Sequence, residues 1–182
     1  MKLTPYSVVL NNSRLQFLFM TSSSSKIPTF LHLKTDNFNK EKQKYGAPLT
    51  SSPAAFDTLM CHFKDTGRSP DYYDLIITGD LGKIGHSVVM DFFNSEGYDI
   101  SSNYKDCGIM MFDTAAQDVH AGGSGCGCSA GVLCGHILNG IKSGLYKNVL
   151  FAATGALMSP TSSGQGESIP GICHAVAISA EV

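Results

Sequence analysis

Two charged residues follow a short apolar segment near the middle of the chain and are candidates for contacting a ligand. The segment 73–78 is almost continuously apolar, as in strands buried on both faces, and Asp80 and Lys83 lie in the turn after it. Lys83 offers a cation for a charge-assisted hydrogen bond to an anion, with His86 as a rival one turn further along. Asp80 is either a ligand contact or a cap for the next helix.

A second candidate is a stretch of small residues that leads into a predicted helix. Its centre consists of Ser124, Gly125, Cys126, Gly127, Cys128 and Ser129. Glycines let the backbone approach a ligand closely, and the unpaired N–H groups and positive dipole end of the following helix suit an anion such as a carboxylate. The alternative is that these small residues only let the helix pack tightly against its neighbours.

The cysteines of this stretch also raise the question of a zinc site, together with Cys134 and His136. Structural zinc sites usually pair ligands two to four residues apart and bring a second pair from elsewhere. Cys134 and His136 are two residues apart inside a predicted helix, so they lie on different faces. We therefore predict no metal site, and nothing in the sequence predicts a cofactor.

The elements that must position these residues alternate regularly from residue 46 onward. Apolar spacing, turn residues and length predict helices at 54–64, 84–94 and 129–143, and strands at 73–78, 108–112, 147–153 and 172–178. The first helix has Ser51, Ser52 and Pro53 as its start signal. On the third helix, we expect Val132, Leu133, His136, Ile137 and Ile141 to share one side.

This alternation predicts an α/β fold in which helices cover a mixed sheet. The last two strands have no helix between them and should pair antiparallel, across a long loop at 154–170 that we expect to bind a partner or close a pocket. Residues 1–45 are poorly patterned and are expected to supply at most an edge strand. The domain proper is predicted to span 46–182.

The composition excludes several classes of protein. The chain has 182 residues, 43% of them hydrophobic, and a formal net charge of -2. Because Lys and Arg are scattered, no basic surface is predicted that would bind nucleic acid. The longest apolar runs are strand-sized, far short of the roughly 20 residues that a membrane-spanning helix needs.

The N-terminal apolar segments are interrupted by the polar residues 11–14, so we predict no signal peptide. We expect a cytoplasmic protein, with any membrane association peripheral. The six cysteines are too few for a disulfide scaffold and are expected to be reduced thiols.

Four stretches of the chain, in the same order, resemble stage V sporulation protein AD, a thiolase-like family of spore-forming bacteria. They are residues 65–83, residues 96–108, residues 121–130, and residues 153–160 together with 165–170. The resemblance covers about residues 46–182 and corresponds to the C-terminal half of the family's two-half fold. It implies a thiolase-like half with a mixed sheet covered by helices.

The resemblance also implies a function and a place. Members of this family bind pyridine-2,6-dicarboxylic acid (dipicolinic acid) instead of condensing acyl thioesters. The implied ligand is this small diacid or its calcium complex, and the implied partners are other subunits of the spore inner-membrane complex. The expected location is the forespore cytoplasm, peripheral to the spore inner membrane.

The loops that carry catalytic groups in thiolase-like enzymes correspond to residues 79–83, 124–129 and 154–157. The first has Asp80 where condensing members use His, the second has Gly and Cys where they use Asn or His, and the third has no Cys. A nucleophile needs an adjacent base and an oriented partner, so we predict no catalytic residues. We expect Asp80, Lys83, residues 124–129, Thr154 and Gly155 to form a shallow ligand cleft at one edge of the sheet.

The hypothesis from the sequence is a non-catalytic sporulation protein that contributes to binding or uptake of dipicolinic acid. Two alternatives stay open. One is a thiolase-like acyltransferase or condensing enzyme, and the other is a truncated, non-functional remnant of the family. A half-fold leaves its former interface apolar and exposed, so we also expect a homodimer or pairing with a separate N-terminal half.

Overall fold

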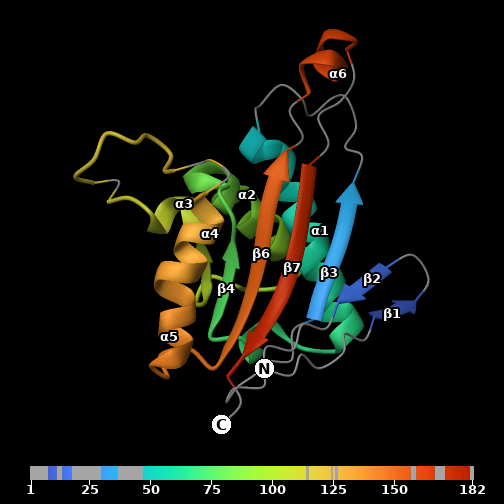
Figure 1. Ribbon diagram of the computed structural model, residues 1–182, viewed down its shortest axis with the longest axis vertical. Helices are drawn as coiled ribbons and strands as arrows, with labels where there is room; N and C mark the ends of the chain where they lie inside the picture. Colours follow the sequence, from blue (N-terminus) through green and yellow to red (C-terminus); the bar gives the residue numbers. More distant parts are fainter. Residues whose placement is uncertain are drawn as a thin grey trace, which may run out of the picture.

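A computed structural model describes residues 8–11, 14–17, 30–36, 47–113, 115–123, 125, 127–156, 159–166 and 171–180, with side chains from residue 51 onward except 162 and 163. Its main sheet has the strand order β3-β7-β6-β4-β5 (Figure 1). These strands are β3 (Phe30–Asp36), β4 (Leu75–Thr78), β5 (Tyr104–Asp106), β6 (Asn148–Ala156) and β7 (Gly171–Ser179). A small antiparallel pair, β1 (Val8–Asn11) and β2 (Arg14–Phe17), forms a separate sheet.

The sheet is mixed, which confirms the predicted fold class. β4 pairs in parallel with both β5 and β6, whereas β7 pairs antiparallel with both β6 and β3. The predicted antiparallel pairing of the last two strands is therefore confirmed. β3 lies at the edge of the sheet, and the predicted domain boundary at residue 46 stays a prediction.

Helices cover both faces of the sheet. α1 (Ala47–Thr66) and α2 (Gly82–Ser95) pack on one face, and the other carries a continuous helical segment made of α4 (Cys128–Val132), the π-helical turn η3 (Leu133–Ile137) and α5 (Leu138–Lys142) (Figure 1). Three short helices, η2 (Pro70–Tyr72), α3 (Cys107–Met110) and α6 (Pro160–Gly164), lie in connections.

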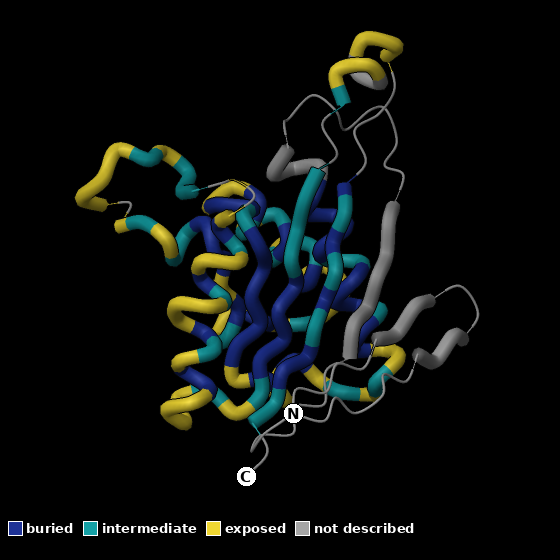
Figure 2. Tube along the Cα trace, viewed as in Figure 1, coloured by how far each residue is buried: buried dark blue, intermediate teal, exposed yellow. Residues whose placement is uncertain are grey.

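The strands divide their side chains between two apolar cores because successive residues of a strand point to opposite faces. Ile76 and Leu150 belong to the core under α1 and α2, whereas Ile77 and Phe151 belong to the core under α4 and α5. Figure 2 shows the resulting buried centre of β4 and β6. This two-sided burial explains why the strands read as nearly continuous apolar runs.

The predicted start of the first helix at Ser51, Ser52 and Pro53 is wrong. α1 begins at Ala47 and contains Pro53. The two serines do not act as caps, because their hydroxyls donate to other elements: Ser51 to the carbonyl of Gly155 (2.8 Å) and Ser52 to the carbonyl of Gly85 (3.2 Å). Such long-range partners cannot be read from local sequence.

The predicted strand at 108–112 is also wrong. The strand is β5, which ends at Asp106, and the chain then turns directly into α3. The Asp106 carboxylate accepts the backbone N–H of Gly108 (2.9 Å), which is the geometry of a helix cap. This cap ends the strand before the apolar run that suggested one.

The expected apolar side of the third helix is partly wrong. Val132, Ile137 and Ile141 are buried and Leu133 packs against them, whereas His136 is exposed. The π-helical turn places an extra residue between Val132 and Ile137, so the buried positions there are five residues apart. His136 instead contacts the hydroxyl of Tyr146 (3.2 Å).

The predicted long loop at 154–170 is shorter than expected, because β6 continues to Ala156 and α6 lies within the connection. A role for it in partner binding or pocket closure stays a prediction. Within the described part of the chain, no helix combines the length and the apolar character needed to cross a membrane.

Candidate functional site

A buried carboxylate organises the turn between β4 and α2. Asp106, at the end of β5, is 1% exposed and accepts four hydrogen bonds. The donors are the Thr78 hydroxyl (2.8 Å) and the backbone N–H groups of Leu81 (3.0 Å), Gly82 (2.9 Å) and Gly108 (2.9 Å). Asp106 therefore ties the start of α2 to the start of α3.

The electrostatics of Asp106 fit this structural role. Burial raises the pKa of its carboxyl group to about 6, although the hydrogen bonds from Thr78 and the backbone act in the opposite direction. The Thr78 hydroxyl also contacts the hydroxyl of buried Tyr104 (2.9 Å), whose ring stacks on His86 with centroids 4.4 Å apart. No role for Asp106 was predicted from the sequence, where it stands between Lys105 and Cys107.

Asp80 joins three loops. One of its carboxylate oxygens accepts the backbone N–H of Gly125 (3.0 Å), and the other accepts the hydroxyl of Thr154 (3.2 Å). The backbone N–H of Asp80 in turn donates to the Thr154 oxygen (3.2 Å). The alternative that Asp80 caps α2 is wrong, because Asp106 accepts the N–H groups at that helix start.

Gly79 lets these loops approach one another. A Cβ atom at this position would lie 2.6 Å from the Thr154 hydroxyl oxygen, 2.7 Å from the Thr154 backbone nitrogen and 2.8 Å from the Ser129 hydroxyl oxygen. Such distances are too short for any side chain. We call the contact of Gly79, Asp80, Gly125, Ser129 and Thr154 the three-loop junction.

Not all predicted site residues take part in this junction. The backbone N–H of Lys83 donates to the carbonyl of Ala121 (2.7 Å), and its side chain is exposed at the start of α2. Gly127 is exposed, whereas Cys128 is buried in the core under α4 and α5. Ser124 and Cys126 lie outside the described residues.

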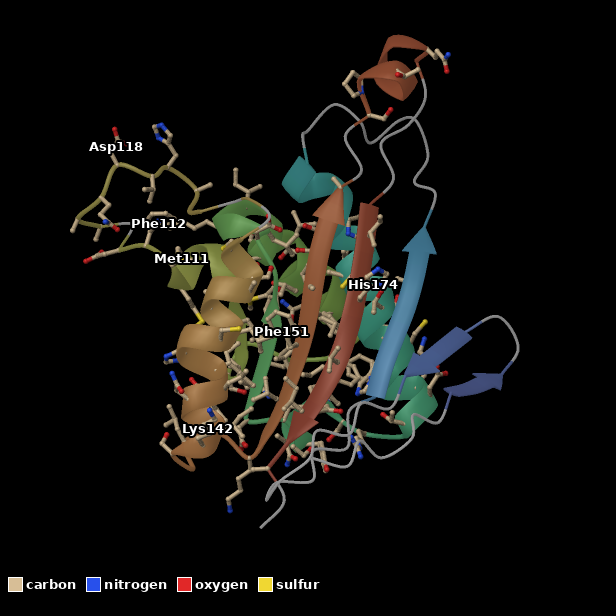
Figure 3. All side chains as sticks on the ribbon, in the orientation of Figure 1. Met111, Phe112, Asp118, Lys142, Phe151 and His174 are labelled. Atoms are coloured by element: carbon tan, nitrogen blue, oxygen red, sulfur yellow. The ribbon has the colours of Figure 1, made fainter. Side chains whose placement is uncertain are left out.

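A pocket of about 270 Å³ opens beside the junction, where β6 ends next to the start of β7. It is lined by Ala153, Thr154, Gly155, Ala156, Ile172 and His174. Two of these residues, Thr154 and Gly155, were predicted site residues, whereas no role was predicted for His174. Figure 3 shows His174 on β7. Ligand binding at this position stays a prediction.

His174 is the unusual group in this pocket. It is partly buried, and its Nδ1 atom is buried without a hydrogen-bond partner, the sole such side-chain atom in the described residues. Burial lowers the pKa of His174 below its usual value, although an interaction with the Cys173 backbone acts in the opposite direction, so the ring is mostly neutral at neutral pH. A neutral imidazole has one donor and one acceptor nitrogen.

The buried thiols are poor nucleophiles. Burial raises the pKa of Cys128, raises that of Cys173 to about 12 and raises that of Cys107 still further. The thiolate is the reactive form, so these three groups are inert at neutral pH. Among the residues that the structure describes, no three His, Cys, Asp or Glu side chains are grouped so that they could hold a metal ion.

Comparisons with known proteins show which family the chain belongs to. The family model for Stage V sporulation protein AD (SpoVAD) matches residues 34–179. Over 125 residues the chain is 47% identical to Stage V sporulation protein AD of Bacillus subtilis (strain 168). That match covers 69% of this chain and 37% of the Bacillus subtilis protein, so the chain spans well under half of its relative's length.

Proposed function

This chain belongs to the stage V sporulation protein AD family, a family of sporulation proteins, and we propose that it contributes without catalysis to binding or uptake of dipicolinic acid at the spore inner membrane. The observation that carries the proposal is the three-loop junction with its adjoining pocket. There, side chains and backbone from three separate loops meet around Gly79. Ligands of open α/β sheets bind at such loop clusters.

The pocket and the junction offer complementary contacts to a planar diacid. Ala153, Ala156 and Ile172 provide an apolar surface for the ring. The exposed backbone of Gly127, at the start of the helical segment that begins with Cys128, lies where N–H groups favour a carboxylate. Within the proposal, exposed Lys83 supplies a cation for a second carboxylate.

The negative charge of Asp80 favours the calcium complex of the diacid over the free diacid as the bound form. Its carboxylate stands at the junction and would repel a free dianion, because like charges at close range raise the free energy of binding. Calcium is bound by carboxylate and carbonyl oxygens. We therefore propose that Asp80 contacts the calcium ion of the complex.

The chemistry of the described cysteines supports a non-catalytic role over a condensing enzyme. An acyl-enzyme would need a thiolate and an adjacent base. Cys107, Cys128 and Cys173 have raised pKa values, and no base is hydrogen-bonded to them in the described residues. The described cysteines are also free of disulfides.

The remaining proposals concern partners and place. Because the resemblance assigns the chain to the C-terminal half of a two-half fold, we propose that an N-terminal half completes the site and strengthens weak binding by this chain alone. Pairing with that half or with a second copy would cover the partly exposed apolar side chains of β6 and β7, such as Ala153 and Val176. Association with other subunits would hold the chain at the membrane periphery.

Calorimetry with calcium-free dipicolinate and with its calcium complex tests the function. We expect the intact chain to bind the calcium complex, and Asp80→Asn to weaken that binding about tenfold while strengthening binding of the free diacid. Asp91→Asn, at an exposed position of α2, is the matched control and should leave both affinities unchanged. Absence of binding to either form, with the N-terminal half present as well as absent, would contradict the proposal.

A further inference from the structure

We infer that His174 is a ligand-binding residue of the pocket and that its Nδ1 donates a hydrogen bond to a carboxylate of a planar diacid. This inference rests on the proposed function and adds to it a residue that neither the family resemblance nor the sequence pattern indicated.

Among the six residues that line the pocket, His174 alone has a buried polar side-chain atom without a hydrogen-bond partner. Ala153, Ala156, Ile172 and Gly155 present only aliphatic groups and backbone. The hydroxyl of Thr154 already donates to the Asp80 carboxylate and accepts the Asp80 backbone N–H. The Nδ1 atom of His174 is buried and has no partner within the described residues.

An unpartnered buried nitrogen is costly and rare in folded proteins. Leaving such a group without a hydrogen bond raises the free energy of the folded protein, and most buried polar atoms have a partner. A bound molecule that supplies the partner would recover this free energy on binding. The unpartnered nitrogen is therefore a feature that a ligand can use.

The ligand's chemistry determines which tautomer binds. The strand neighbours of His174 are uncharged: its register partners are Ala153 on β6 and Leu33 on β3, and Ile172 and Val176 flank it at the two-residue spacing of one strand face. A neutral ring in this setting carries one proton, on Nδ1 or on Nε2. Dicarboxylates offer only acceptors, so Nδ1 must carry that proton in the complex.

Two substitutions separate a binding role from a structural role. His174→Leu removes the hydrogen bond and also removes the unpartnered nitrogen. We expect it to weaken binding of the calcium–dipicolinate complex about tenfold while leaving the unfolding midpoint unchanged or higher. His174→Asn keeps an N–H donor close to the Nδ1 position and should bind within about threefold of the unsubstituted chain.

His120→Asn is the matched control for the loss of a histidine. Its side chain is 91% exposed, and its backbone φ of 49° is one that Asn accepts readily. This variant should bind and unfold like the unsubstituted chain.

The outcomes are distinguishable in calorimetry and urea unfolding of the full chain. Weakened binding by His174→Leu with retained stability, and rescue by His174→Asn, support the inference. Unchanged binding by His174→Leu overturns the inference and leaves the proposed function standing. Lower stability of His174→Leu assigns the ring a structural role and also overturns it. If the unsubstituted chain binds no dipicolinate in either form, the proposed function fails and the inference fails with it.

Discussion

Two polar sites on different strands of the main sheet differ in how completely their hydrogen-bonding capacity is used. Asp106, at the end of β5, is fully buried and receives four donors from two turns. His174, beside the end of β6, lies in a pocket wall with its Nδ1 unpartnered. A polar group whose bonds are all made within the protein holds the fold together, whereas a group with a missing partner is available to a ligand.

The largest expected effect comes from removing the carboxylate of Asp106. Asp106→Ala leaves four donors without their acceptor and should lower the free energy of unfolding by about 3 kcal/mol or more. Urea unfolding followed by circular dichroism measures this change. Asp91→Ala, at an exposed position, should change it by no more than about 0.5 kcal/mol. Equal effects of the two substitutions would show that Asp106 does not organise the turn.

A smaller effect is expected at Gly79, which lies between the two sites. Gly79→Ala forces a Cβ atom against the backbone of Thr154 and should lower the free energy of unfolding by about 2 kcal/mol. The matched control is Gly135→Ala in the π-helical turn, where an added Cβ meets no atom within 4 Å. That substitution should be neutral or slightly stabilising, because Ala favours helix more than Gly does. A Gly79→Ala variant as stable as the Gly135→Ala variant would contradict the close packing of the junction.

The smallest effect is a dependence of stability on pH through His86. Burial, with a smaller contribution from Lys105, lowers the pKa of His86 below 6.5 in the folded chain. As pH falls through 6.5, the unfolded chain takes up the proton first, so this group makes folding less favourable at lower pH. His86→Gln should therefore lose less stability than the unsubstituted chain between pH 7.5 and 5.5. An identical loss in both proteins would show that His86 is not responsible.

Asp106 has the opposite effect on the pH dependence of stability, and this effect appears at lower pH than that of His86. Its pKa is about 6 in the folded chain and 3.8 in its unperturbed state. The folded chain binds this proton more tightly, so the contribution of Asp106 favours folding increasingly as pH falls from about 6 to about 4. Asp106 is present in both His86→Gln and the unsubstituted chain, so the difference in stability between the two proteins isolates the contribution of the histidine.

The sequence predicted the sheet better than it predicted the polar contacts. Apolar runs such as 73–78 and 172–178 indicated strands correctly, because burial on both faces is a local property of composition. The apolar run 108–112 was wrongly predicted to be a strand, because the Asp106 side chain caps helix α3, which begins at Cys107. Ser51 was wrongly predicted to mark the start of the first helix, since its hydroxyl donates to the carbonyl of Gly155, 104 residues away.

The candidate site, too, could be predicted from the sequence only in part. Asp80, Ser129 and Thr154 were singled out by their loops, and the structure brings them into contact around Gly79. His174 could not be singled out, because its role depends on a cross-strand register and on the lack of a partner for one ring nitrogen. Both are properties of the folded chain alone.

The central claim is that the diacid binds at the three-loop junction and its pocket, and a ¹H–¹⁵N NMR titration tests it most directly. On addition of the calcium–dipicolinate complex, we expect the amide signals of Gly79, Gly125, Ser129 and Gly155 to shift together with the ring signals of His174. Signals from Ser95 and Lys142, at the far ends of α2 and α5, should stay in place. Saturating ligand that leaves the junction signals unmoved, or that shifts only those distant residues, would contradict the account.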